Sequence, residues 1–215
     1  LAVLTTGTPY FIQGSHPAML VMVKSDLEQA CVSKRSIVSL GGSVFYAAPD
    51  GFMLLSSGGS DSLTKELMDR DDWQNLHPAS IHAYGHDNQY IAFHDAATDE
   101  YGNVTYGFVV DLKSKQFVRH SIPAVAGFND LRGDTLYLVR PDGVLVKWGE
   151  GAAVKGLWRS KIFSQPQMNG FACAQVEAGP FGARSPYPLT VRFYADQKLF
   201  YSYEILGQDY QDPNN

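Results

Sequence analysis

Residues 41–54 of this chain read GGSVFYAAPDGFML, and residues 133–146 repeat the pattern as GDTLYLVRPDGVLV. Each copy is an apolar strand, a Pro-Asp-Gly turn and a second apolar strand. Proline presets φ for a turn, aspartate bonds back to its own backbone, and glycine accepts positive φ without a steric cost. A recurring hairpin predicts a modular all-β scaffold, in which the Pro49 and Pro141 corners lie in equivalent surroundings.

The two copies are 92 residues apart, and a third strand-rich unit lies halfway between them, at Asn88–Phe93. A unit therefore recurs about every 46 residues, which is near the length of a four-stranded propeller blade. Further apolar runs that predict strands are Leu1–Leu4, Pro9–Ile12, Ala18–Val23 and Val104–Val110. We expect residues 1–165 to form a β-propeller-like domain of antiparallel blades.

One stretch, residues 61–77, departs from the strand pattern. Its apolar residues recur at helical spacing, and they are Leu63, Leu67, Met68, Trp73 and Leu76. Thr64 or Asp61 is a candidate cap for a first turn, and Asp69 with Asp72 for a second, while Pro78 ends the segment. This predicts a short helical insertion on a connection between blades.

The pattern changes again after Trp158. Residues 180–188 are rich in Gly, Pro and Ser, and a clear hairpin follows over residues 189–203. We expect residues 166–215 to be a β-sandwich-like segment that is incomplete. Because the first residue is Leu1 rather than an initiator Met, we also expect a processed or truncated chain.

Composition limits the function classes. The net charge is −5 and charged residues make up only 18% of the chain, so non-specific binding to the nucleic-acid backbone is not expected. No apolar run reaches the length that a membrane span needs, and no membrane insertion is expected. The two cysteines, Cys31 and Cys173, are interpreted as buried thiols.

Histidines and a polar loop offer candidate metal ligands. His82, His86 and His94 are spaced by four and eight residues, but a turn at Tyr84 and Gly85 removes the geometric meaning of the first spacing. The loop from Asp95 to Asn103, with Asp99 and Glu100, lacks the alternating acids of a calcium-binding hand. We interpret both groups as locally bonded or solvated, and expect no cofactor.

Carboxylates offer candidate catalytic pairs. Asp69, Asp71 and Asp72 are interpreted as helix-capping residues. Asp50 and Asp142 could pair as in a glycosidase only if two turns met within a few ångströms, and identical turns on separate blades lie far apart. The chain is therefore not expected to be an enzyme.

The chain resembles tail hub, nozzle or stabilisation-type virion proteins of tailed bacteriophages and prophages. The resemblance covers about residues 1–206, and the order and spacing of short motifs carry it. These motifs are Cys31–Val38, the Gly41-Gly42 pair with Tyr46–Gly51, Pro9-Tyr10 with Gly14, Trp73 before Pro78, Trp158–Lys161 and Val191–Asp196. Where that family usually continues Ala-Asp-Gly, this chain has Gln197.

This resemblance implies a propeller-like domain followed by the start of a β-sandwich, and a structural role without catalytic residues. Copies would form a ring at the distal end of a tail or at the neck, through which double-stranded DNA passes transiently. The partners implied are other copies of the chain and neighbouring tail or neck proteins. The protein would be made in the bacterial cytoplasm and reside in the virion tail.

Basic and aromatic side chains are the candidate contacts to neighbouring subunits or DNA; they are Lys34, Arg35, Arg159, Lys161, Trp73 and Trp158. The alternative for the basic residues is an exposed strand edge, where charge discourages unwanted pairing. Two other function classes stay open. A carbohydrate- or receptor-binding propeller would use aromatic and acidic loop residues, and a polysaccharide hydrolase would need two converging carboxylates.

Overall fold

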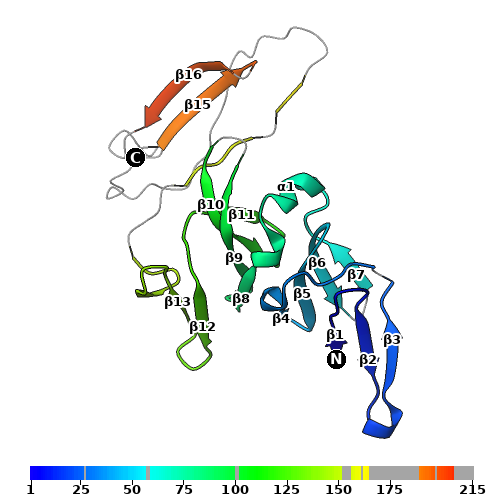
Figure 1. Ribbon diagram of the computed structural model, residues 1–215. Coiled ribbons are helices and arrows are strands. Elements are labelled where there is room, and N and C mark those ends of the chain that lie inside the picture. Colours follow the sequence, from blue (N-terminus) through cyan, green and yellow to red (C-terminus); the bar gives the residue numbers. More distant parts are fainter. Residues whose placement is uncertain are drawn as a thin grey trace, which may run out of the picture. The chain divides into compact units, whose positions relative to one another are not determined.

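The computed structural model describes residues 1–26, 28–56, 59–99, 102–151, 156–160, 162–164, 189–196 and 198–205. The chain divides into two compact units, Leu1–Glu150 and Gly151–Asn215. The expected domain boundary at residue 165 lies outside the described residues. The all-β prediction is confirmed, because the described regular structure is almost entirely antiparallel strands with one short α-helix (Figure 1).

The first unit contains four antiparallel sheets, each built from strands that follow one another in the chain. Sheet A comprises β1 (Ala2–Val3), β2 (Tyr10–Gln13) and β3 (Val21–Lys24). Sheet B comprises β4 (Val38–Leu40), β5 (Ser43–Ala48), β6 (Gly51–Ser56) and β7 (Gly59–Ser62). Sheet C comprises β8 (His82–His86), β9 (Gln89–Thr98), β10 (Val104–Asp111) and β11 (Phe117–His120). Sheet D comprises β12 (Ala126–Asp130), β13 (Thr135–Val139) and β14 (Leu145–Lys147).

Helical segments are short, and the expectation of a helix near 61–77 is only partly met. The α-helix α1 covers Arg70–Gln74, and Asp69 caps it by accepting a hydrogen bond from the Asp72 N–H at 2.8 Å, as expected. Residues 61 and 62 belong instead to β7. The Thr64 hydroxyl accepts a hydrogen bond from the Phe52 N–H, so Thr64 stabilises strand β6 rather than capping a helix. The 3-10 turns are η1 (Pro17–Met19), η2 (Lys34–Ser36) and η3 (Pro78–Ser80).

Three hydrophobic cores join the sheets face to face in chain order. Side chains of sheets A and B share one core, sheets B and C share a second with α1, and sheets C and D share a third. We call the face of a sheet that is turned toward the preceding sheet its N-side face, and the opposite face its C-side face. Sheets B and C are thus buried on both faces.

The 46-residue spacing reappears in how the second strand of each sheet is oriented. Tyr46 points to the core with sheet A, while its neighbour Phe45 points to the core with sheet C. The same alternation holds for Ala92 and Ile91 in β9, which face sheets B and D respectively. Within each of these strands successive side chains point to opposite faces, so the two neighbouring positions of the repeat serve two different cores.

Close contact between sheets depends on two glycines in their first strands. A Cβ at Gly85 in β8 would lie 2.8 Å from the Leu40 side chain of sheet B, and one at Gly127 in β12 would lie 2.9 Å from the Tyr84 ring of sheet C. Hydrogen bonds reinforce both contacts. The Tyr90 hydroxyl donates to Ser36 O at 2.7 Å, and the Asn129 amide donates to Gly85 O at 2.7 Å.

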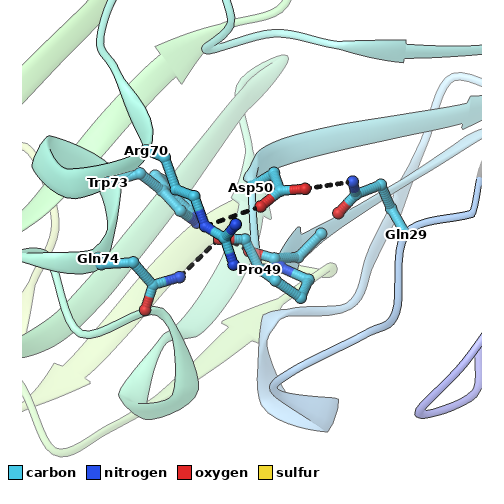
Figure 2. Close-up of polar contacts among 7 residues, drawn as sticks. Gln29, Pro49, Asp50, Arg70, Trp73 and Gln74 are labelled. Carbon is cyan, nitrogen blue, oxygen red and sulfur yellow. Dashed lines mark hydrogen bonds and ion pairs between the residues drawn. The ribbon is translucent and has the colours of Figure 1, made fainter.

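The prediction of equivalent Pro49 and Pro141 corners is wrong, although both hairpins form. Ala48 pairs with Gly51 across a two-residue turn, whereas the second corner is a longer loop in which Gly143 takes a φ of 80°. The first corner bonds to Arg70 and Gln74 of α1 and to Gln29, as Figure 2 shows. The Pro141 corner is exposed and bonded only within its own loop.

The second unit is described by one hairpin, sheet E, formed by β15 (Leu189–Ala195) and β16 (Lys198–Ile205). The rest of the expected β-sandwich segment lies outside the described residues. Within the part of the chain that is described, the sheets do not close on one another, so the propeller stays a prediction. No helix in these ranges is long and apolar enough to cross a membrane.

Candidate assembly surfaces

The histidines considered as metal ligands are packing residues. His82 is buried and stacks on Phe93, with ring centroids 5.4 Å apart, and the His94 ring bonds the neighbouring Asp95 carbonyl at 2.6 Å. His86 lies 3.9 Å from the Asp134 carboxylate. Across the described ranges, no group of three or more His, Cys, Asp or Glu side chains is placed to hold a metal ion.

The candidate carboxylate pair is divided between two local networks. Asp50 accepts a hydrogen bond from the Gln29 amide at 2.7 Å and pairs with Arg70 at 3.1 Å (Figure 2). Asp142 pairs with Arg140 at 2.9 Å, in its own loop. The two carboxylates therefore belong to separate networks, Asp50 with residues from two other connections and Asp142 with a residue of its own loop.

The loop after β9 is closed by its own polar residues. Both carboxylate oxygens of Asp99 accept hydrogen bonds from the Asn103 amide, at 3.2 and 2.9 Å, and one also accepts from the Asn103 N–H. This pattern is a local turn, as the sequence predicted.

Trp73 lies in the core rather than at a surface. It is 0% exposed, packs in the core between sheets B and C, and donates its indole N–H to Ala48 O at 2.8 Å. Its side chain therefore has no surface to offer to a neighbouring subunit, contrary to the expectation for this residue. The sequence showed that Trp73 is apolar and lies at helical spacing, and both properties are equally typical of a core residue.

The basic pair in η2 is exposed, and one member has a partner within the chain. Lys34 and Arg35 both reach solvent, and Arg35 donates to Val125 O at 2.9 Å, just before sheet D. This hydrogen bond thus connects the turn before sheet B to the residue just before sheet D. Lys34 retains the exposure that a contact residue requires.

The second unit holds the remaining expected contacts. Trp158 is 85% exposed, and the Arg159 guanidinium carbon lies 6.0 Å from the centroid of the Tyr194 ring. This distance is at the limit for a cation–π contact. Lys161 lies outside the described residues.

The C-side face of sheet D carries exposed apolar side chains that sequence reasoning missed. The register places the Phe128, Tyr137 and Lys147 side chains in one row across the sheet, and Ala126, Val139 and Leu145 in the next. Phe128 is 67% exposed and Leu145 is 62% exposed. The repeat could have identified this face, because Tyr137 and Val139 stand where Phe45 and Ala47 stand in sheet B.

The N-side face of sheet A also carries exposed apolar side chains. Ile12 and Met22 are directly paired, as are Tyr10 and Lys24, and Val3 pairs with Tyr10. Met22 is 62% exposed, and Tyr10, Ile12 and Val3 are partly exposed. Large apolar side chains are thus exposed on both sheet A and sheet D of the first unit.

No protein-family model matches this chain, and no curated protein sequence matches it significantly.

Proposed function

We propose that this chain is a structural subunit of a bacteriophage or prophage tail, a hub or nozzle wall or a connector, and that it acts through assembly rather than catalysis. The observation that carries the proposal is the set of large exposed apolar side chains on sheets A and D, such as Met22, Phe128 and Leu145. Monomeric proteins rarely leave broad apolar patches in water, and larger ones mark interaction sites.

Two further observations support the proposal. Sheets B and C are buried on both faces, so the packed centre of the first unit is stiff and suits a wall element. The chain also resembles tail hub, nozzle and stabilisation-type proteins over about residues 1–206, on the motifs given above. Its net charge of −5 suits a conduit, because a strongly basic lumen would hold DNA through counterion release.

In this proposal the partners are other copies of the chain and adjacent tail or neck proteins, with passage of double-stranded DNA. The place of action is the virion tail, after synthesis in the bacterial cytoplasm. Lys34 and Trp158, which are exposed, are the residues of the expected contact set best placed to meet such partners.

Negative-stain electron microscopy and light scattering of the purified protein test this function. We expect discrete rings or closed oligomers whose mass is a multiple of 23.7 kDa. Single chains at the highest attainable concentration contradict the proposal. A glycan-array signal from such single chains would favour the carbohydrate-binding alternative instead.

A further inference from the structure

A cavity of about 230 Å³ lies within the first unit, between α1 and the end of sheet C that carries the loop after β9. Leu76 and Ala97, which are both buried, contribute apolar surface to it, while Asp72, Asn75 and Arg119 contribute polar groups. Sites for drug-sized molecules measure roughly 300–1,000 Å³. A molecule that fills this cavity is therefore smaller than that class.

The strand pairing explains why a hollow forms at this place. Ala97 pairs with Thr105 and Phe93 pairs with Gly107, so β9 has more residues than β10 between these two pairs. Such a bulge bends the strand and increases its local twist, and bulges are common beside binding and active sites. The cavity lies over Ala97 and Thr105, beyond the bulge.

The pairing of β11 places Arg119 beneath α1. Arg119 lies directly opposite Phe108, and residues opposite each other on neighbouring strands share a face of the sheet. Phe108 is buried and contacts Trp73 of α1, with ring centroids 6.0 Å apart. The partly buried Arg119 side chain therefore lies on the face that α1 covers, and it lines the cavity.

Opposite charges line this cavity without neutralising each other. Within the described ranges, neither the Arg119 guanidinium nor the Asp72 carboxylate forms a hydrogen bond or an ion pair. Asp99 adds a second carboxylate, which the Asn103 amide engages. Charges that are partly removed from water gain stability from a partner of opposite sign. A molecule that carries both a negative and a positive group would supply one partner to each side of the cavity.

We propose that this cavity binds a small zwitterion, an α-amino acid with a short aliphatic side chain. The ligand carboxylate pairs with the Arg119 guanidinium, whose planar fork matches a carboxylate in two parallel hydrogen bonds. The ligand ammonium pairs with the Asp72 carboxylate, and the aliphatic side chain packs on Leu76 and Ala97. None of the described residues that line the cavity is aromatic, so a sugar finds no ring on which to stack.

This binding site is separate from the proposed assembly role, because none of its described residues belongs to sheet A or sheet D. Calorimetric titration of the full chain tests the class of ligand. L-Valine is the probe, and its matched analogues are valinamide, which lacks the carboxylate, and N-acetyl-valine, which lacks the ammonium. We expect L-valine to bind, and each analogue to bind at least about tenfold more weakly, because each leaves one charged side chain unpaired.

Three results of this titration would overturn the proposal. They are the absence of L-valine binding at millimolar concentration, an analogue that binds as tightly as L-valine, and D-glucose that does so. Inorganic phosphate that binds where L-valine does not would show a simple anion site at Arg119, and would also overturn it.

Variants of the two charged residues test where each group of the ligand lies. Arg119→Met keeps the aliphatic stem, and it should abolish the preference for L-valine over valinamide while keeping the preference over N-acetyl-valine. Asp72→Asn should do the reverse. Arg132→Met and Asp71→Asn are matched controls at exposed positions that do not line the cavity, and both should bind like the wild type.

Circular dichroism verifies that each variant is folded. Folded variants that weaken all three ligands by the same factor would refute the assigned positions, because each charge is expected to recognise only one group of the ligand. None of these results bears on assembly, so the proposed function is decided by its own experiment.

Discussion

Acid should loosen the contact between sheets C and D, because a buried histidine, His82, and a partly buried one, His120, flank Phe93 there. The His82 ring stacks on Phe93 at 5.4 Å, and the His120 ring meets it edge-on at 5.1 Å. Burial lowers the pKa of both to about 4, and the Arg35 charge adds to this for His82. For His120, a backbone hydrogen bond with Ala92 opposes the effect of burial without cancelling it.

The sign and size of the effect follow from proton linkage. A histidine in the unfolded chain has a pKa near 6.5, so between about pH 6.5 and 4 the unfolded state binds protons that the folded state excludes. Stability is then intact above about pH 7 and falls as the pH drops to about 4. At about 1.4 kcal/mol per pKa unit, His82 contributes a loss of about 3 kcal/mol, and His120, which is partly exposed, somewhat less.

A loss of about 5 kcal/mol for the pair would be a large part of the 5–15 kcal/mol that stabilises a typical domain. Urea unfolding followed by circular dichroism at several pH values from 7.5 to 4.5 measures it. The variant His82→Gln/His120→Gln should lose much less stability over this interval, since carboxylates titrate mostly below it. His16→Gln, at an exposed position, is the control. An equal loss in the wild type and the double variant would refute the reasoning.

Other substitutions test the core and the repeat. Trp73→Ala should lower the free energy of unfolding by about 3–5 kcal/mol, because the ring is fully buried and Ala48 O loses its donor; urea unfolding measures this. Gly127→Val should cost about 1–3 kcal/mol in the same assay through overpacking. Phe45→Glu should prevent folding, because Phe45 is buried, whereas Tyr137→Glu at the equivalent but partly exposed repeat position should leave a folded protein, as circular dichroism would show.

Much of the fold could be predicted because it depends on local patterns. The hairpins at residues 43–56 and 135–147 follow from apolar alternation around a turn, and the 46-residue spacing located β9 between them. Asp69 was identifiable as a cap from the spacing to Asp72 alone. These features involve residues that are close in sequence, where propensity and spacing are enough.

The features that could not be predicted depend on residues far apart in the chain. The Pro49 corner differs from the Pro141 corner because Trp73 donates to Ala48 O and Arg70 pairs with Asp50, contacts across 20 or more residues. The sequence around the two turns is alike, so nothing local separates them. The same applies to Trp73, whose helical spacing showed an apolar face but not which surface would cover it.

The repeat connects the internal cores to the outer face of sheet D. Phe45, Ile91 and Tyr137 occupy equivalent places on the second strands of sheets B, C and D, and the first two are buried in the internal cores. Tyr137 lies on the same face as Phe128 and Leu145, which are 67% and 62% exposed. The pattern that builds the internal cores therefore also makes the C-side face of sheet D apolar, and side chains of this kind in contact with water favour burial against another surface.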